Sequence, residues 1–589
     1  MRTATFDIEC YRDYFLVSFL NIDTGNVTHV EMFDGQALDE IKLRKILANY
    51  RLVSFNGNNY DLPILSLALS GADNAMLKEA SDLIIKTGLK HWHLEEKYQF
   101  KVLRPDHIDL IEVAPGMVSL KIYGGRLHTR TMQDLPIEPE ASITPEQRAQ
   151  LREYCANDLR VTAELYAHLT PQIELRARMS DEYGIDLRSK SDAQIAEAVI
   201  RARVQAITGF EVERPEVLAG AAFRYRTPPW VSFATPALQD MLRMVESARF
   251  IVPDTGKVVM PKELAEAKIA IGASTYRMGI GGLHSCEKSI AHRSDDTFQL
   301  LDRDVASYYP SIILNLGLQP QQMGAAFTAT YKQIVQRRLA AKHAGDKVTA
   351  DALKITINGS FGKFGSKWST LFSPTLLIQV TLTGQLALLM LIEMLEQAGI
   401  AVVSANTDGV VIKCPHARYD ECESIIAAWE ICTGFETEEA LYDALYSRDV
   451  NNYIAIKPDG KFKLKGVYAF GGISKNPTNE ICTHAVVRHL VDGTPVEHTI
   501  DACKDITKFI TIRSVKGGAV KDDRYLGRAV RWYYSLAEAG TIKYKVNGYN
   551  VPRSEGAAPL MELPDRFPDD IDLGWYITEA NNILKDIGA

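Results

Sequence analysis

Apolar and polar residues alternate with a period of two in several short segments near the N-terminus, a pattern that predicts half-buried β-strands. The expected strands cover residues 3–9, 14–20, 27–33, 52–55 and a region near 108–113. Helices are expected after the third strand, from Asp61, and over 144–169. This order predicts a mixed sheet covered by helices, an α/β unit.

Farther along the chain, an apolar strand pattern runs up to Asp304 and ends in a turn. Two helices follow, one over 331–341 and one that carries Lys354 and Asn358, and we expect them to form an antiparallel pair. The first carries Arg338 and the second Lys354, so two cationic faces are expected near Asp304. Arg and Lys on such faces suit a triphosphate.

Two further strands, at 400–405 and 409–413, are separated by a short Asn-Thr-Asp turn. The pattern places Asp408 at the tip of this hairpin. Since carboxylates bind divalent metals, Asp304 and Asp408 form a candidate metal pair. Turns of this composition are common and usually structural, so the pair matters only in combination with the basic helices.

Length and composition are typical of a soluble, multidomain protein. At 589 residues the chain exceeds one hydrophobic core, so about three to five compact units are expected. Eight cysteines without a Cys-x-x-Cys pair indicate neither a zinc ribbon nor a disulfide framework. Residues 368–392 carry no charge, but Ser, Thr, Pro374 and two Gln interrupt them, which favours a buried helix over a membrane span. Because the N-terminus turns acidic without a signal-peptide core, we expect a cytosolic protein, in the host cytoplasm if the source is viral.

The net charge of −8 argues mildly against nucleic-acid binding, but the charge is unevenly distributed. Lys and Arg outnumber Asp and Glu by eight to two over 331–367 and by sixteen to nine over 457–550. Local basic surfaces on an acidic protein suit a groove that binds phosphates. Solvated helix faces explain either cluster almost as well, so charge leaves both interpretations open.

Acidic residues lie at the ends of several expected elements in the N-terminal unit. Asp7 and Glu9, two apart on a strand, project from one face. Asp61 begins a helix, while Tyr154 and Asp158 share a face of the last helix. Four converging carboxylates can hold two hard divalent cations, which activate water in phosphodiester hydrolysis. Solvated acids are the alternative for any one of these residues, but the ordered set favours a metal site.

This set resembles the motifs of the DEDDy 3′–5′ exonuclease family. The matching segments are Asp7-Ile8-Glu9, Asn56 through Tyr60-Asp61, and Tyr154-x-x-x-Asp158. The resemblance implies an RNase H-like fold that removes nucleotides from a DNA 3′ end. It assigns metal ligation and catalysis to Asp7, Glu9, Asp61 and Asp158, catalysis to Tyr154, and DNA contacts to Asn56 and Tyr60. Some polymerase-linked members add a lysine between the second and third motifs, and Lys121 is the nearest candidate.

A second ordered set resembles the family B DNA polymerases. The matching segments are Asp304-x-x-Ser307-Tyr308-Tyr309-Pro310, Lys354-x-x-x-Asn358-Gly359-Ser360-Phe361-Gly362 and Asn406-Thr407-Asp408. The segment from Arg448 to Tyr453, with Lys465-Gly466 beyond it, resembles the region that contacts the primer–template minor groove. The resemblance implies a polymerase with palm, fingers and thumb behind the exonuclease, and short bacteriophage members are similar in kind.

By this resemblance, each active site uses two Mg²⁺ ions, with Mn²⁺ as an alternative, for in-line phosphoryl transfer. The polymerase metal residues it implies are Asp304, Val305 and Asp408. The implied nucleotide-binding residues are Arg338 (or Arg337 in its place), Lys354, Asn358, Phe361 and Tyr309, the last as the block to a 2′-hydroxyl. The implied DNA contacts in this part are Tyr453, Lys465 and Gly466.

Four positions depart from the family pattern. Asn406 stands where aspartate is usual, Gly409 and Gly359 where serine is common, and Phe361 where tyrosine is common. We expect Asn406 to alter metal affinity or the pH profile more than it abolishes activity. Spacing also excludes the long insertions of protein-primed phage enzymes, since 50 residues separate Asp304 from Lys354. An ordinary nucleic-acid primer, without a terminal protein, is therefore expected.

The sequence thus predicts an α/β and α+β multidomain enzyme, an RNase H-like exonuclease followed by a palm/fingers/thumb polymerase. The expected division is 1–175 exonuclease, 176–300 linker and start of palm, 301–325 palm, 326–367 fingers, 368–473 palm and 474–589 thumb. In the thumb, basic residues that include Arg531 are suited to gripping the DNA backbone, and packing is the equal alternative for the aromatic run 532–534.

The function predicted from these motifs is template-directed DNA polymerisation with 3′–5′ proofreading in phage-type replication. Primer–template DNA, dNTPs and other replication proteins are the expected partners, with no membrane. Two alternatives stay open: a 3′–5′ exonuclease with a weakened polymerase site, and a non-catalytic DNA-binding replication scaffold. The carboxylates retained at both sites disfavour the scaffold.

Overall fold

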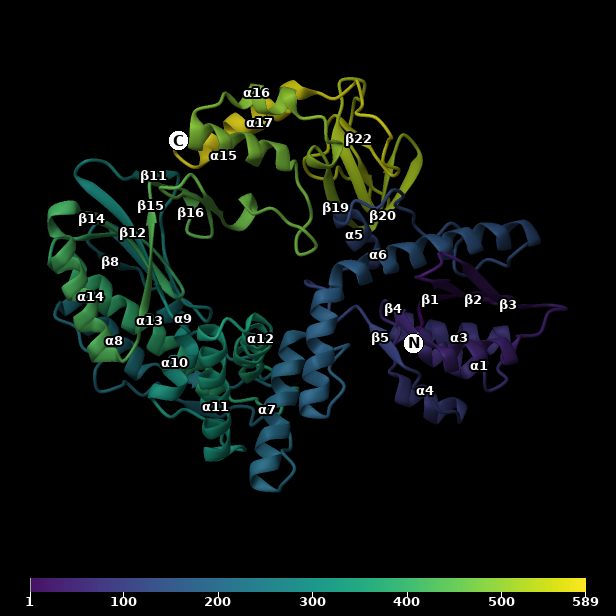
Figure 1. Cartoon of the computed structure of the whole chain (residues 1–589), viewed down its shortest axis with the longest axis horizontal. Coiled ribbons are helices and arrows are strands. Elements are labelled where there is room, and N and C mark those ends of the chain that lie inside the picture. Colours follow the sequence, from purple (N-terminus) through teal and green to yellow (C-terminus); the bar gives the residue numbers. More distant parts are fainter. Residues whose placement is uncertain (1) are drawn as a thin grey trace. The chain divides into compact units, whose positions relative to one another are not determined.

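The computed structural model describes residues 2–589 and divides into two compact units (Figure 1). The first unit joins 2–191 to 470–481 and 501–576, and the second joins 192–469 to 482–500 and 577–589. The chain passes from one unit to the other at 191/192 and 469/470, and again within three helices, α15 (Glu480–Asp492), α16 (Val496–Ala502) and α17 (Leu573–Asp586). The predicted α/β and α+β multidomain fold class is confirmed. The finer sequence-based division into six segments stays a prediction.

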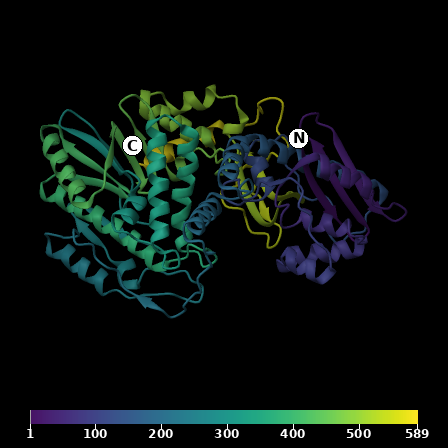
Figure 2. The same cartoon turned by 60° about the horizontal axis from the view of Figure 1, so that its bottom comes forward.

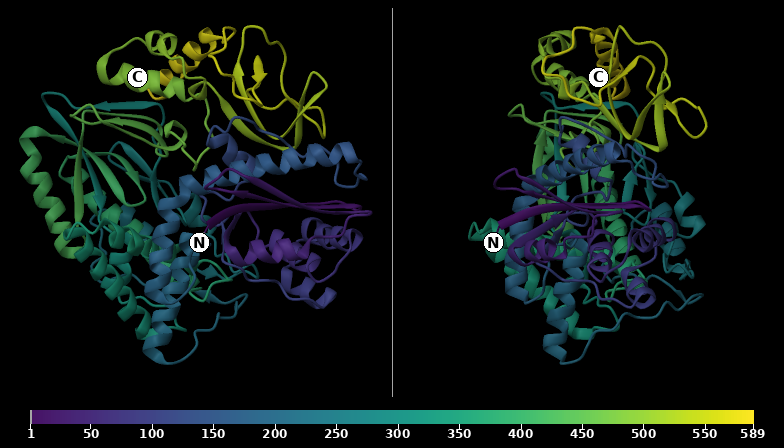
Figure 3. Two further views of the ribbon diagram at one scale, coloured as in Figure 1. Left: turned by 45° about the vertical axis from the view of Figure 1, so that its right-hand side comes forward. Right: turned by 90° about the vertical axis from the view of Figure 1, so that its right-hand side faces the viewer.

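A five-stranded mixed sheet forms the core of the N-terminal part of the first unit. Its order is β3-β2-β1-β4-β5, with antiparallel pairing from β3 to β1 and parallel pairing from β1 to β5. The strands are β1 (Arg2–Cys10), β2 (Tyr14–Asn21), β3 (Val27–Phe33), β4 (Tyr50–Ser54) and β5 (His107–Asp109). The helices are α1 (Glu40–Asn49), α2 (Asp61–Ala68), α3 (Asn74–Thr87), α4 (His91–Tyr98), α5 (Leu120–Arg126) and α6 (Pro145–Tyr183). Helix α6 covers one face of the sheet, and α1 and α3 cover the other (Figure 3).

Helix α6 begins and ends where its sequence supplies caps. The Thr144 hydroxyl accepts the Gln147 N–H while the Gln147 side chain accepts the Thr144 N–H, a reciprocal capping box. The helix ends at Gly184, whose φ of 66° is readily adopted by glycine. The sequence predicted an end near 169, but the helix continues through Pro171 because apolar residues extend its buried face to Met179.

A four-stranded sheet in the order β21-β19-β20-β22 completes the first unit. Its strands are β19 (Thr511–Lys521), β20 (Arg524–Tyr534), β21 (Lys543–Tyr544) and β22 (Ala557–Pro559). The aromatic run at the end of β20 is buried. Packing, rather than DNA contact, therefore accounts for these three side chains.

Arg531 fastens this sheet to the N-terminal part of the unit. Its side chain is fully buried, and burial lowers its pKa to about 10. Its guanidinium donates to the carbonyl oxygens of Thr129, Arg130 and Leu560. The Met132 N–H donates to the Met561 carbonyl nearby, at 2.8 Å. The expectation that Arg531 grips DNA is wrong, because its donors are satisfied inside the protein.

The second unit is built on a seven-stranded sheet of order β15-β12-β14-β13-β10-β9-β8, and all of its pairs are antiparallel. In chain order the strands are β8 (Ile269–Ile271), β9 (Ser274–Met278), β10 (Leu283–Ser285), β12 (Phe298–Val305), β13 (Ala401–Asn406), β14 (Gly409–Pro415) and β15 (Thr437–Tyr442). The predicted hairpin is confirmed as β13 and β14.

A four-stranded sheet and a short strand pair complete the β structure of the second unit. The four strands are β11 (Ile290–Arg293), β16 (Ala444–Asp449), β17 (Asn452–Ile456) and β18 (Phe462–Leu464). The pair is β6 (Ala222–Phe223) with β7 (Phe250–Ile251). The remaining short helices are α8 (Pro236–Ser247), α9 (Lys262–Glu266) and α10 (Tyr308–Asn315).

Helix α13 (Pro374–Gln397) packs with α14 (Tyr419–Thr433) and the seven-stranded sheet. It is long and apolar enough to span a membrane, yet 83% of its most apolar window is buried inside the protein. Its polar groups have protein partners: the Gln385 amide exchanges two hydrogen bonds with the backbone of Gly279, and the Gly384 carbonyl accepts from Tyr308. The expectation of a buried helix is confirmed.

Helices α11 (Gly324–His343) and α12 (Lys347–Phe364) lie side by side as the predicted antiparallel pair (Figure 2). A third helix, α7 (Asp192–Thr208), packs against both. Five residues of α7 are buried, and they fall in the segment 176–300 that the sequence predicts to be the linker and start of the palm.

Candidate active sites

The acidic side chains of the first unit gather beside the second half of β1. Strand β4 pairs with β1 only as far as Thr5, and Asp7 and Glu9 follow on β1. Asp61 begins α2, and its carboxyl group is close enough to Asp7 for the two charges to interact. Helix α6 contributes Tyr154, Cys155 and Asp158. The structure therefore brings together all five predicted catalytic residues of this unit.

Asp61 is the most enclosed of these acids. Its side chain is 3% exposed, and its Oδ1 atom is buried without a hydrogen-bond partner. Burial, followed by the charges of Asp7 and Asp109, raises its pKa well above the ordinary value. An acceptor held in this state requires a cation or a proton.

Asp7 and Glu9 show the same electrostatic condition. Burial and the nearby Asp158 carboxylate raise the pKa of Asp7 to about 7. Burial, with the charges of Asp7 and Asp158, also raises the pKa of Glu9. The carboxylates of Asp7, Glu9 and Asp158 thus repel one another in a partly buried site, and bound positive charge would relieve that repulsion.

Lys121 of α5 supplies the protein's own positive charge. Its ammonium donates to the Tyr154 hydroxyl at 2.7 Å and to the Asp158 carboxylate at 3.0 and 3.2 Å. It also lies 4.5 Å from the centre of the Tyr154 ring. Lys121, named only as the nearest candidate from sequence, is therefore in the site and fixes two of its residues.

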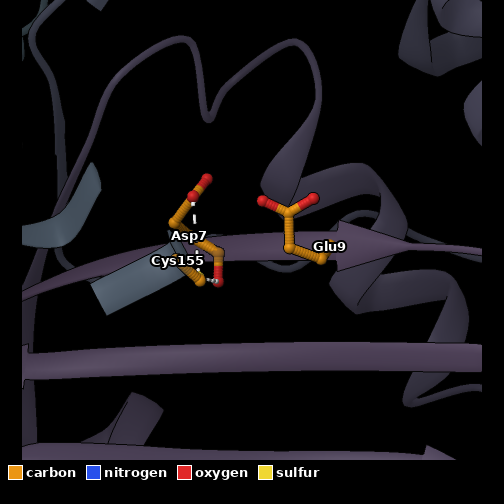
Figure 4. A group of neighbouring side chains, drawn as sticks. All are labelled: Asp7, Glu9 and Cys155. Atoms are coloured by element: carbon orange, nitrogen blue, oxygen red, sulfur yellow. Dashed lines mark hydrogen bonds between the residues drawn. The ribbon is translucent and has the colours of Figure 1, made fainter. Parts of the chain in front are cut away.

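Cys155 is the group that the sequence did not single out. Its buried thiol lies 3.7 Å from Asp7 Oδ2, and the ligand atoms of Asp7, Glu9 and Cys155 lie within 4.8 Å of one another (Figure 4). Its position one residue after Tyr154 on an inward-facing helix was the only sequence signal for this placement.

A divalent cation fits this cluster. The donors are carboxylate oxygens, which hard cations prefer. One of them, Asp61 Oδ1, is buried with no partner, and within residues 2–589 one lysine, Lys121, is hydrogen-bonded to the set. The residues that would hold such ions are Asp7, Glu9, Asp61 and Asp158.

The turn 56–60 lies beside this site. Asn56 has a φ of 71°, and its N–H and that of Asn58 donate to the Asp109 carboxylate at 2.7 and 2.9 Å. The Tyr60 hydroxyl is 2.8 Å from Ser81 Oγ. Asn56 and Tyr60 are both partly exposed. Their role in binding DNA stays a prediction.

In the second unit, Asp304 and Asp408 lie at the same end of the seven-stranded sheet. Asp304 is the last-but-one residue of β12 and pairs across to Gly409, the first residue of β14. Asp408 occupies the tip of the β13–β14 hairpin, and its carbonyl oxygen accepts the Val305 N–H at 2.8 Å. Burial raises the pKa of both carboxyl groups. The predicted carboxylate pair is therefore assembled.

Lys463 of β18 lies close to this pair, and the sequence reasoning missed it. Its ammonium lies 3.1 Å from Asp302 and 3.8 Å from Asp304. Asp302 is buried and also accepts from the Tyr442 hydroxyl. Burial disfavours the charge on Lys463, but Asp302, the Tyr453 and Tyr442 hydroxyls and Asp304 together outweigh this and raise its pKa. Only the three-dimensional pairing of β18 with β17 reveals this contact.

Tyr309 and Phe361 form a stacked pair with ring centres 4.3 Å apart. The Tyr309 hydroxyl donates to the Gly281 carbonyl at 3.0 Å, which holds the ring against a glycine turn at 279–282. A β-carbon on Gly282 would collide with Thr407, so this turn also abuts the Asp408 hairpin. Tyr309 and Phe361, the two predicted pocket residues, therefore contact each other beside the turn that carries Asp408.

The predicted phosphate-binding residues lie on α11 and α12. Arg338 donates to the Ser307 hydroxyl at 3.1 Å, which places it at the turn after Asp304. Lys354 and Asn358 are exposed on α12, one turn apart. Their exposed heads are available to a ligand, and ligand binding itself stays a prediction.

The departures from the family pattern have local explanations. A β-carbon on Gly359 would lie 2.5 Å from the Asp192 carbonyl oxygen, because α7 begins against this point of α12. Gly409 is similarly enclosed by Asp304. Asn406 donates from its amide to the Val450 carbonyl at 2.9 Å, a bond that an aspartate would not make.

Tyr453, Lys465 and Gly466 lie together next to Lys463. The Lys465 N–H donates to the Tyr453 carbonyl, and its ammonium is 5.9 Å from the Tyr453 ring centre. Gly466 has a φ of 64°, and a β-carbon there would collide with Asn451 and Asn452. These residues form one local structure, and their contact with DNA stays a prediction.

Comparison with known proteins gives distant relatives. No family model matches the chain. It is 22% identical over 494 residues to DNA polymerase 1 of Aeropyrum pernix, a match that covers 75% of this chain and 45% of that protein. DNA polymerase 1 of Sulfolobus acidocaldarius is 26% identical over 124 residues, 21% of this chain and 14% of that protein. The chain thus spans less than half the length of these relatives.

Among solved structures, the family B DNA polymerase from the hyperthermophilic archaeon Pyrobaculum calidifontis aligns with the whole chain and with 78% of its own length. The sequence identity is 15% and the TM-score is 0.42.

Proposed function

We propose that this chain is a template-directed DNA polymerase of the family B type that also carries a 3′–5′ exonuclease. The observation that carries the proposal is the assembly of Asp304 and Asp408 at one sheet end, beside the Tyr309–Phe361 stack. Asp304 and Asp408 are 104 positions apart in the chain, and they follow the order of the polymerase motifs that the sequence resembles. The 22% identity to an archaeal DNA polymerase supports the same proposal.

In the polymerase site, the chain's own residues bind and orient the substrates. Arg338 and Lys354 offer positive charge to a dNTP triphosphate, the Arg by a fork and the Lys by a point charge. The Tyr309–Phe361 stack offers a flat surface to the base and sugar. The Tyr309 ring would lie close enough to the sugar to exclude a 2′-hydroxyl. Lys463 holds the end of β12 through Asp302, so that Asp304 keeps its place.

Two Mg²⁺ ions per site, or Mn²⁺ in their place, would be held by Asp304 and Asp408, with Val305 beside them, and by the four acids of the first unit. When bound, they supply charge neutralisation and an activated oxygen nucleophile for phosphoryl transfer.

In the exonuclease site, Lys121 holds the Tyr154 hydroxyl and the Asp158 carboxylate in one arrangement. A water bound against these groups would be oriented toward a phosphodiester. Asn56 and Tyr60, at the neighbouring turn, would contact the 3′-terminal nucleotides. The enzyme would then remove a mispaired nucleotide before extension resumes.

We also propose phage-type replication on an ordinary nucleic-acid primer in the host cytoplasm. The interval between Asp304 and Lys354 contains only α10, α11 and the start of α12. That leaves no further folded element to receive a terminal protein. Primer–template DNA, dNTPs and other replication proteins would be its partners, and Tyr453, Lys465 and Gly466 would follow the duplex.

A second candidate is an exonuclease whose polymerase site is weakened. Asn406 favours it, since its amide is engaged with Val450 and supplies no charge beside Asp408. A labelled primer–template with Mg²⁺, with and without dNTPs, separates the two. Asp408→Ala should abolish extension and retain degradation, and Asp7→Ala should do the opposite. Absence of extension under Mg²⁺ and Mn²⁺ would refute the polymerase.

A further inference from the structure

Cys155 adds a sulfur donor to the acidic cluster of the first unit. Its thiol is buried and lies 3.7 Å from Asp7 Oδ2 and 3.9 Å from the Asp7 carbonyl oxygen. With Glu9 it forms the one group of His, Cys, Asp or Glu donors close enough to share an ion among residues 2–589. Figure 4 shows the three side chains converging from β1 and α6.

The separation of sulfur and oxygen is that of two ligands on one ion. Zinc binds sulfur at about 2.3 Å and carboxylate oxygen at about 2.0 Å in tetrahedral geometry, so the two donors lie about 3.5 Å apart. The observed 3.7 Å needs almost no adjustment. Glu9, within 4.8 Å of both donors, needs a small side-chain rotation to complete a third bond.

Asp61 is an independent sign that this place takes a cation. Its carboxylate interacts electrostatically with that of Asp7, and its Oδ1 atom is buried without a hydrogen-bond partner. A tetrahedral ion with three protein ligands keeps a fourth position open. Asp61 Oδ1 is the unused acceptor on this side of β1.

We infer that this cluster binds a thiophilic divalent cation, such as Zn²⁺, Co²⁺ or Cd²⁺, through Asp7, Glu9 and the Cys155 thiolate. The thiol loses its proton to solvent when the metal–sulfur bond forms. Soft sulfur selects these ions over Mg²⁺. The inference rests on the proposed function in one respect: the thiophilic ion would occupy the exonuclease site that the proposed function assigns to Mg²⁺.

The consequence is that the nuclease site and the polymerase site would differ in which metal ions they prefer. No cysteine joins Asp304 or Asp408 in a donor group of this kind among residues 2–589. Zn²⁺ in the presence of excess Mg²⁺ should therefore inhibit degradation at concentrations that leave extension unaffected.

The test is a Co²⁺ titration of the full chain, followed by the near-ultraviolet charge-transfer band of a cobalt–thiolate bond. The exposed Cys286 and Cys432 are first replaced by Ser to remove competing thiols. This parent should show the band with one equivalent of Co²⁺. Cys155→Ser and Cys155→Ala should lose it and bind Co²⁺ at least about 10-fold more weakly. Two variants are used because a buried hydroxyl and a buried methyl perturb the fold differently.

The parent spectrum decides the matter even where both variants unfold. Bound Co²⁺ without a charge-transfer band in the parent would overturn the inference, as would a band that persists in either folded variant. If the protein degrades DNA with Mg²⁺ yet shows no band, the proposed function stands and the sulfur ligand is refuted. If it shows the band but never degrades DNA, the proposed nuclease is refuted and the metal site stands.

Discussion

The carboxylate of Asp304 lies directly against the backbone of Gly409, its cross-strand partner. A β-carbon at 409 would be 2.2 Å from Asp304 Oδ1 and 2.9 Å from the Arg303 carbonyl oxygen, both closer than real β-carbons approach. Glycine at 409, where the family B pattern that the sequence resembles commonly has serine, thus allows Asp304 to occupy its present position. The loss of a serine side chain at 409 thus makes room for the Asp304 carboxylate.

Gly409→Ser should displace the Asp304 carboxylate and lower the rate of primer extension. Misplacement of a catalytic group by about 1 Å can cost roughly 100-fold, and we expect a loss of at least about 10-fold. Single-turnover extension measures it. Degradation by the Asp7 site of the same protein is the matched control, and an unchanged extension rate would show that the carboxylate tolerates the move.

Lys463→Gln should destabilise the second unit and weaken extension, because Asp302 would remain buried without its ion pair. The lysine is 39% exposed, so the expected loss is about 1–2 kcal/mol, below that of a fully buried pair. Urea unfolding measures it. Lys461→Gln, next to the same strand and 78% exposed, is the control and should unfold like the unsubstituted chain. Equal midpoints for the two variants would contradict the role given to Lys463.

Asp61→Asn should abolish degradation and raise thermal stability in the presence of a chelator. The amide removes the charge of a buried carboxylate that Asp7 and Asp109 repel, and it carries donors of its own. Mg²⁺ should raise the melting temperature of the unsubstituted chain more than that of the variant. Calorimetry with EDTA and with Mg²⁺ tests both statements, and a variant less stable under EDTA would oppose the electrostatic account.

His107 should make stability depend on pH between about 4 and 6.5. Burial lowers its folded-state pKa from 6.5 to about 4, and Ser54 and Asn58 lie at its two ring nitrogens at 2.8 and 3.2 Å. Below pH 6.5 the unfolded chain binds a proton that the folded chain does not. Stability is therefore fully present above about pH 6.5 and decreases by up to roughly 3 kcal/mol as the pH falls toward 4.

The control for this titration is His107→Gln, measured by urea unfolding at several pH values. Other buried histidines and the carboxylates contribute their own slopes in both proteins. The difference between the two curves isolates His107, and parallel curves from pH 6.5 to 4 would contradict its assignment.

Asn406→Asp should reduce stability rather than restore a missing catalytic charge. The amide now donates to the Val450 carbonyl, and a carboxylate there would face a second acceptor. Loss of such a bond costs about 1–2 kcal/mol. Unfolding and the Mg²⁺ dependence of extension are measured together. A stable variant that extends at lower Mg²⁺ would instead support a direct effect of Asn406 on metal binding.

The sequence placed Asp7, Glu9 and Asp304 on strands and Asp408 at a hairpin tip, as the structure has them, because the strand pattern around each is legible in the sequence. Contacts between elements that are distant in the chain could not be predicted from the sequence. Lys463 reaches the site through strand pairing alone, and Lys121 through the approach of α5 to α6. Arg531 was misjudged because charge in the sequence suggests a surface, whereas three backbone carbonyls enclose it.

Arg531 and its neighbours also determine when the first unit can be completed. The Arg130 carbonyl accepts the Leu563 N–H, and the Met132 N–H donates to the Met561 carbonyl. A nascent chain emerges from its N-terminus, so these groups wait for their partners until residues 531–563 have been synthesised. The first unit is therefore completed only after residues 192–469 of the second unit have been made.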